Sequence, residues 1–295
     1  MNNESINFYN KNGYIILSDI LSPDIVNNLV STTDRIAKDE NTIERFNHLY
    51  DFENSHDKNN LKVLRRIQTP ELIDSLYRDV GQNSELLANL SQLLGQNIRL
   101  EGIKINFKSA KCGSEILWHQ DWAYQPYTND NVLTIGILLD DCNESNSPIH
   151  VIPESHKGPT YRHDRLGVFS GAIDLTQDYL PTHEAIPLLG KVGDITVHHY
   201  RILHYSPKNI SNHPRKMLFI RYASADAWPL MGVLDYKDGF SFEIMKSRIV
   251  LGEQTLEPKL KEVPVRMPLP YPDSFSKLNP GLRSYGILES FSSEK

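Results

Sequence analysis

The chain has 295 residues, of which 39% are hydrophobic and 23% charged, a balance typical of globular proteins and not of disordered or collagen-like ones. Its 31 lysine and arginine residues face 37 aspartate and glutamate residues, giving a net charge of −6 that argues against nucleic-acid binding. No apolar run is long enough to cross a bilayer, and residues 1–5 do not resemble a signal peptide. With only two cysteines, Cys112 and Cys142, we expect no disulfide framework and a cytoplasmic protein.

The first part of the chain, about residues 1–97, predicts a helical layer. A short strand is expected at 13–17, and a helix should begin near Ser22 and Pro23 and continue to about Lys38. Residues 40–60 are polar and predict an irregular connection. The remaining amphipathic segments are 70–77 and 84–94.

From about residue 98 the pattern changes to short β-rich segments separated by turn residues. These segments are 98–107, 116–119, 132–139, 149–152, 195–199 and 217–223. Strands without intervening helices favour an antiparallel sandwich or barrel. We therefore expect one domain over residues 1–295, with a β core at about 98–225 and a tail at about 226–295 that wraps the surface. The tail is rich in proline, at Pro258, Pro264, Pro268, Pro270 and Pro272.

A long segment at 157–184 interrupts the strand pattern. Loops of this length in compact domains are usually functional, which predicts a lid over an active site, with a solvated charged loop as the alternative. Four of its side chains could recognise a polar or anionic substrate: Tyr161, Arg162, His163 and Arg165.

Histidine is concentrated in the β-rich part, where nine of the 11 residues lie between His119 and His213. The sharpest local motif is the tetrapeptide Trp-His-Gln-Asp at 118–121. In a strand, His119 and Asp121 would face the same side. Two histidines and one carboxylate that leave open metal positions are typical of non-haem Fe(II) oxygenases. Candidates for the third ligand are His198, His199 and His204.

Three segments together resemble the phytanoyl-CoA dioxygenase family, at residues 118–121, 153–158 and 193–215. That family belongs to the Fe(II)- and 2-oxoglutarate-dependent oxygenases. The resemblance implies a mainly β protein with N-terminal helices and a double-stranded β-helix core, also called a jelly roll or cupin-like fold. It implies metal ligation by His119, Asp121 and His204. It places Arg215 on the far carboxylate of 2-oxoglutarate, with Ser206 and Asn106 beside this cosubstrate and Arg221 as the alternative to Arg215.

The resemblance also implies Fe(II), 2-oxoglutarate and O2 as the cofactor and cosubstrates. The expected reaction is hydroxylation of an unactivated C–H bond of a small molecule, with succinate and CO2 as coproducts. Asp121 stands where related halogenases have a small residue, which favours hydroxylation, or a desaturation or oxidative cyclisation after the same hydrogen abstraction. The competing classes are a metal-binding jelly-roll sensor without turnover and a zinc hydrolase.

Two aromatic residues, Trp122 and Tyr124, follow the metal motif directly. They could line a substrate pocket, and packing within the sandwich is the alternative. The sequence leaves the substrate and the oligomeric state open.

Overall fold

The computed structural model describes residues 1–53, 63–232 and 242–270, and the structural statements below refer to these ranges. The N-terminal elements are α1 (Asn3–Asn12), β1 (Tyr14–Leu17), α2 (Pro23–Ile36), α3 (Glu40–Arg45), η1 (Asn47–Leu49), β2 (Tyr50–Phe52), β3 (Leu64–Gln68), η2 (Pro70–Leu72), α4 (Leu76–Gly81) and α5 (Ser84–Leu94). The following strands and turns are β4 (Ile98–Lys108), β5 (Ile116–His119), η3 (Asp121–Ala123), β6 (Val132–Leu138), β7 (Ile149–Val151), η4 (Ser155–Lys157), β8 (Asp164–Arg165) and β9 (Val168–Phe169). The chain continues with η5 (Thr182–Glu184), β10 (Ile186–Leu188), β11 (Ile195–His199), β12 (His204–Ser206), β13 (Arg215–Ser224), α6 (Phe242–Ser247) and β14 (Ile249–Leu251).

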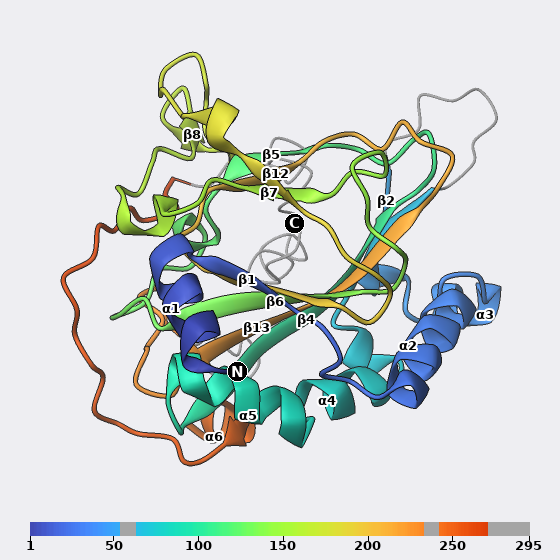
Figure 1. Cartoon of the computed structure of the whole chain (residues 1–295), viewed down its shortest axis with the longest axis horizontal. Coiled ribbons are helices and arrows are strands. Elements are labelled where there is room, and N and C mark those ends of the chain that lie inside the picture. Colours follow the sequence, from blue (N-terminus) through green and yellow to red (C-terminus); the bar gives the residue numbers. More distant parts are fainter. Residues whose placement is uncertain (54–62, 233–241, 271–295) are drawn as a thin grey trace, which may run out of the picture.

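Two antiparallel sheets carry the fold. The larger has eight strands in the order β1-β11-β6-β13-β4-β3-β2, with β14 paired to β4, and the smaller has four in the order β10-β7-β12-β5. Figure 1 shows the smaller sheet above the larger one, and helices α2, α4 and α5 below the larger sheet. The molecule therefore has three layers, with the large sheet between the helices and the small sheet.

Side-chain alternation along the large sheet separates an apolar layer from a polar one. On β4, Ile103 and Ile105 belong to the main hydrophobic core, which also contains Leu29 of α2 and Leu86 of α5. The intervening residues of each strand face the small sheet instead, since successive strand side chains point to opposite faces. Hydrophobic burial against the helices therefore holds the large sheet, and its other face is free to carry polar groups.

Most of the predicted elements are confirmed. The segments 84–94, 116–119 and 195–199 have the predicted bounds, and the helix expected from Ser22 begins at Pro23, with the Ser22 side chain accepting from the backbone N–H of Ile25. The expected strands at 98–107, 132–139, 149–152 and 217–223 are present with ends shifted by one or two residues.

Two predictions for the N-terminal part are corrected. Residues 40–60 are not wholly irregular, because α3, η1 and β2 lie there; residues 54–60 fall outside the described residues. The segment 70–77 is a 3-10 turn followed by the start of α4. The helical layer also supplies β1, β2 and β3 to the large sheet. The strand expected at 13–17 is present as β1, whereas β2 and β3, which were not predicted, are strands because β2 pairs with β3 and β3 pairs with β4.

The described end of the tail runs along the outside of the molecule, as Figure 1 shows in red. The Pro264 carbonyl accepts hydrogen bonds from the Trp122 indole and the Thr160 hydroxyl, and Lys261 pairs with Asp130 at 2.6 Å. Pro272 lies outside the described residues. None of the described helices is long and apolar enough to span a membrane.

Candidate metal and cosubstrate site

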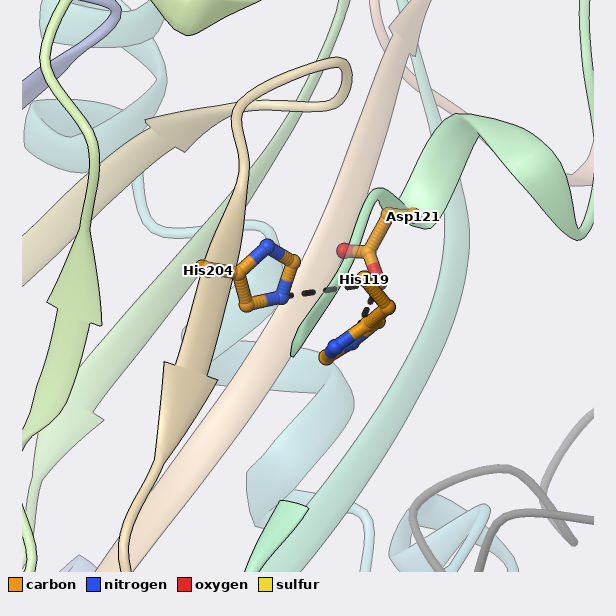
Figure 2. Close-up of side chains that lie close together, drawn as sticks. All are labelled: His119, Asp121 and His204. Atoms are coloured by element: carbon orange, nitrogen blue, oxygen red, sulfur yellow. Dashed lines mark ion pairs between the residues drawn. The ribbon is translucent and has the colours of Figure 1, made fainter. Parts of the chain in front are cut away.

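Strand pairing brings His204 next to His119 and Asp121, which are close to each other in the sequence but far from His204. His119 is the last residue of β5, Asp121 opens η3, and His204 is the first residue of β12. Because β5 and β12 are antiparallel neighbours, His204 lies directly opposite His119. Figure 2 shows the three side chains pointing toward one another.

The distances within this group fit one metal ion. The Oδ1 atom of Asp121 lies 3.7 Å from Nε2 of His119 and 3.9 Å from Nε2 of His204. One ligand atom from each residue lies within 4.8 Å of the others. Metal–ligand bonds of about 2.1 Å place donor atoms about 3–4 Å apart around one ion, and both distances to Asp121 fall within this range. The three residues present a two-histidine, one-carboxylate donor set.

Hydrogen bonds orient both imidazoles. Nδ1 of His119 lies 2.8 Å from the Leu117 carbonyl oxygen, and Nδ1 of His204 lies 3.1 Å from that of Ile202. Each Nδ1–H therefore donates to the backbone and leaves the Nε2 lone pair facing the centre of the group. Burial lowers the pKa of both rings, that of His204 to about 4, so both are neutral at pH 7 and ready to bind a metal.

The carboxylate of Asp121 uses its two oxygens differently. Its Oδ2 atom accepts a hydrogen bond of 3.1 Å from the Thr134 hydroxyl and lies 3.7 Å from Nε2 of His198. Oδ1 faces the two histidines. Burial by itself raises the pKa of Asp121, but the neighbouring His198 and His204 outweigh it and hold this pKa well below its usual range. The group is an ionised carboxylate with one oxygen directed at the metal position.

The group opens into a pocket between the two sheets, with an empty volume of about 480 Å³. Its described lining consists of Lys104, Asn106, Ile116, His119, Asp121, Thr134, Ile149, His198, His204, Tyr205, Ser206, Arg215 and Phe219.

Arg215 carries the strongest sign of an anionic ligand in this pocket. Its side chain is buried, and among the described residues neither Nε nor Nη1 has a hydrogen-bond partner. The hydroxyl of Ser206, also buried on the pocket wall, has none either. Buried polar groups are rarely left unsatisfied, and guanidinium groups commonly bind carboxylates. These unpartnered atoms therefore indicate an anionic ligand in this part of the pocket.

The alternative, Arg221, lies elsewhere. Its Nη1 donates to the Tyr200 hydroxyl at 2.9 Å, and it is absent from the described pocket lining. Asn106 does line the pocket, and its Oδ1 accepts from Nε of Arg66 at 2.9 Å.

The structure places the four residues expected to meet substrate around the metal motif, but the described pocket lining includes none of them. Trp122 packs in a separate apolar cluster, and Tyr124 presents its ring edge-on 5.9 Å from the His119 ring and donates to the Gly171 carbonyl. Arg162 pairs with Asp164 at 2.6 Å on the surface. His163 is buried and accepts a hydrogen bond of 2.8 Å from the backbone N–H of Gln120. Their substrate role, and the lid role of 157–184, stay predictions.

The pocket residues missed from the sequence include two polar ones, Lys104 on β4 and Thr134 on β6. A signal for Lys104 was present, because it stands two residues before Asn106 and so shares its strand face. Thr134 could be assigned only once the pairing of β6 with β11 placed it opposite His198.

Comparison with known proteins agrees with this geometry. The phytanoyl-CoA dioxygenase profile matches residues 9–217. The chain belongs to the phytanoyl-CoA dioxygenase family. Over 270 residues it is 37% identical to a probable alpha-ketoglutarate-dependent hypophosphite dioxygenase of Stutzerimonas stutzeri, covering 89% of this chain and 90% of that protein. It is 22% identical to the ectoine dioxygenase of Bordetella bronchiseptica, covering 76% and 75%.

A solved structure confirms the predicted fold. EctD from S. alaskensis, with 2-oxoglutarate and 5-hydroxyectoine, superimposes with a TM-score of 0.67 at 19% identity, covering 90% of this chain and 88% of that one. The double-stranded β-helix expected for this phytanoyl-CoA dioxygenase family member is therefore present. The protein is a 2-oxoglutarate-dependent non-haem iron dioxygenase that uses Fe(II), 2-oxoglutarate and O2. This excludes the sensor and zinc-hydrolase alternatives.

Proposed function

We propose that His119, Asp121 and His204 hold the Fe(II) ion and that Arg215, with Ser206, binds the far carboxylate of 2-oxoglutarate. The observation that carries this assignment is the buried Arg215, two of whose nitrogen atoms have no hydrogen-bond partner among the described residues and which lines the same pocket as the three metal-ligand candidates. Asn106 supports the cosubstrate from the neighbouring strand, since it shares the pocket wall.

In this proposal, the chain contributes binding and orientation. Fe(II), 2-oxoglutarate and O2 supply the oxidising chemistry when bound. The backbone carbonyls of Leu117 and Ile202 hold the two imidazoles in place, and Thr134 restrains the Asp121 carboxylate so that one oxygen faces the metal position. The surrounding apolar side chains, Ile116, Ile149 and Phe219, limit the access of water to the pocket.

For the substrate, we propose hypophosphite as the first candidate. Support comes from the relative that shares 37% identity over 89% of this chain and is described as a probable hypophosphite dioxygenase. The balanced reaction inserts one oxygen atom of O2 into a P–H bond and the other into succinate. Hypophosphite, 2-oxoglutarate and O2 become phosphite, succinate and CO2. The broader expectation is hydroxylation of a C–H bond in a small molecule, or the desaturation or cyclisation that begins with the same abstraction.

The test is anaerobically purified enzyme supplied with Fe(II), 2-oxoglutarate and hypophosphite, and then with O2. We expect phosphite and succinate to form in equal amounts. Phosphorus NMR measures the phosphite. Succinate formed without phosphite would refute hypophosphite as the substrate while leaving the oxygenase assignment in place. No succinate under any condition would refute the proposed roles of the site residues.

We also propose that the enzyme works in the cytoplasm. Two free cysteines support this location, because Cys112 is exposed and Cys142 is buried without a disulfide between them. Reducing compartments preserve free thiols. Fractionation of cells that express the full chain tests the proposal, and enzyme found only in a membrane-bounded or secreted fraction would refute it.

A further inference from the structure

Gln120 lies in the sequence between two of the proposed metal ligands, His119 and Asp121, and it is fully buried. It is absent from the described pocket lining, so its polar groups do not serve contact with a ligand in the pocket. A buried primary amide is costly unless it is hydrogen-bonded. The partners of Gln120 therefore indicate what the residue does.

The Gln120 side chain holds two other parts of the chain beside the metal motif. Its Oε1 atom accepts a hydrogen bond from the backbone N–H of Tyr161 at 2.9 Å, and its Nε2 atom donates to the Pro159 carbonyl at 3.0 Å. Nε2 also donates at 2.9 Å to the carbonyl of Arg201, in the turn before β12. One amide thus joins the metal motif to the segment 157–184 and to the turn that precedes the third ligand.

Backbone groups of the metal motif add further hydrogen bonds to the same segment. The backbone N–H of Gln120 donates to Nε2 of His163 at 2.8 Å. The Trp118 carbonyl accepts from the backbone N–H of Ile173 at 2.9 Å. The segment 157–184 is therefore attached to the metal motif at two places along its length, and Gln120 makes most of these bonds.

A metal ion bound by His119 and Asp121 restricts the backbone on both sides of Gln120. The hydrogen bonds of Gln120 depend on that backbone, because its N–H and its side chain both project from it. Ordering these groups once lowers the entropy cost of holding the segment, and a held segment lowers the cost of ordering the ligands. Two processes that order the same groups favour each other by the same factor.

We infer that Gln120 is a positioning residue that couples the metal site to the segment 157–184. Metal binding holds this segment in place through Gln120, and the held segment strengthens metal binding. The inference rests on the proposed function, because it requires a metal ion at His119 and Asp121. It adds a role for the residue between these ligands, which contacts neither the metal position nor the pocket.

The experiment is hydrogen–deuterium exchange of the full chain with and without Mn(II), measured at single amides. The reporters are the backbone N–H groups of Tyr161, which donates to Gln120, and of Ser170 and Gly171, which donate to a carbonyl within the segment. The backbone N–H of Thr176 is the internal reference, because it donates to a side chain in the exposed part of the same segment. Calorimetry measures the affinity for Mn(II).

Wild type is compared with two variants of the buried amide. Gln120→Met has a similar length and lacks the amide, and Gln120→Glu has the same shape but keeps only the acceptor for the Tyr161 N–H. Gln177→Met is the matched control, because Gln177 is exposed on the same segment and its side chain donates to the neighbouring Asp174.

We expect Mn(II) to slow exchange at the three reporters of wild type by about tenfold, since it lowers the population of the open segment, and to leave Thr176 unchanged. A factor of this size corresponds to about one hydrogen bond. In Gln120→Met the slowing should fall below about threefold, and Mn(II) should bind about three- to tenfold more weakly, because the coupling is reciprocal. Gln120→Glu should show a smaller slowing than wild type, and Gln177→Met should match wild type.

A merely structural role of Gln120 gives a different result. Exchange in Gln120→Met would then rise by the same factor with and without Mn(II), the slowing and the Mn(II) affinity would equal those of wild type, and the inference would be overturned. If Gln120→Met does not fold, Gln120→Glu takes its place, and a slowing equal to that of wild type overturns the inference.

Wild type alone also tests the inference. If it binds Mn(II) in calorimetry but exchanges equally fast with and without the metal at all three reporters, Gln120 does not couple the two parts and the inference is overturned. Failure of the proposed function has another signature. Wild type would then not bind Mn(II) at all, which would refute the metal site and the inference together.

Discussion

Replacing Arg215 should make the ligand-free protein more stable and remove its response to 2-oxoglutarate. The guanidinium is buried, and Nε and Nη1 have no partner among the described residues. A buried polar atom without a hydrogen bond costs about 1–3 kcal/mol. Arg215→Met has a similar length and no polar atoms, so it should raise the free energy of unfolding of the ligand-free protein by at least about 2 kcal/mol.

Binding of 2-oxoglutarate should stabilise wild type and offset its lower stability relative to Arg215→Met. A ligand present at 100 times its dissociation constant stabilises the folded state by about 2.7 kcal/mol. Wild type should gain that amount from 2-oxoglutarate in the presence of Mn(II), which replaces iron to prevent turnover, and Arg215→Met should gain almost nothing. Urea unfolding with and without 2-oxoglutarate measures both quantities.

Arg221→Met is the matched control. Arg221 donates to the Tyr200 hydroxyl and lies outside the described pocket lining, so its replacement should leave the gain from 2-oxoglutarate intact. The reasoning is refuted if Arg215→Met is stabilised by 2-oxoglutarate as much as wild type is. Loss of the gain in Arg221→Met alone would identify Arg221 as the cosubstrate residue.

Two further predictions concern histidines. In calorimetry, His204→Ala should bind Fe(II) more than 100-fold more weakly than wild type. His198→Ala removes only a neighbour of Asp121 and should weaken Fe(II) binding about 10- to 100-fold. Wild-type Fe(II) affinity in His204→Ala would show that another residue is the third ligand. Burial lowers the pKa of His163 to about 4, and its Nε2 accepts from the Gln120 N–H only while the ring is neutral. The unfolded state binds more protons between pH 6.5 and 4, so stability falls as the pH falls through this range. Between pH 7.5 and 5.5, the free energy of unfolding of His163→Gln should therefore fall by about 1.4 kcal/mol less than that of wild type, as measured by urea unfolding. Equal decreases in the two proteins would contradict a neutral, buried His163.

The elements that could be predicted are those whose sequence carries its own signal. The helix from Pro23 has a serine cap and a 3.6-residue apolar period. Strand β4 alternates apolar and polar residues over most of its length, and β6 is a short, almost continuous apolar run in which every residue is buried. The short strands β2 and β3 lacked such a signal. They are strands because β3 pairs with β4 and β2 pairs with β3. The division of the chain into one domain with a boundary near residue 98 stays a prediction.

The sequence by itself indicated the type of chemistry. A histidine and an aspartate two residues apart suggested a metal site, since these residue types are typical iron ligands. The resemblance to the phytanoyl-CoA dioxygenase family then implied 2-oxoglutarate, with His204 and Arg215 as the later site residues. Local spacing was informative for the first pair because His119 ends β5 and Asp121 follows it at the start of η3.

Only the tertiary structure shows where the later histidines lie relative to His119 and which charged side chains share the pocket. The pairing of β12 with β5 places His204 opposite His119, whereas β11 places His198 on the large sheet, behind the second oxygen of Asp121. The register of β4 against β13 sets Lys104 beside Phe219 and away from Arg215. These relations depend on hydrogen bonds between distant strands, and a one-residue shift in register would turn each side chain to the opposite face.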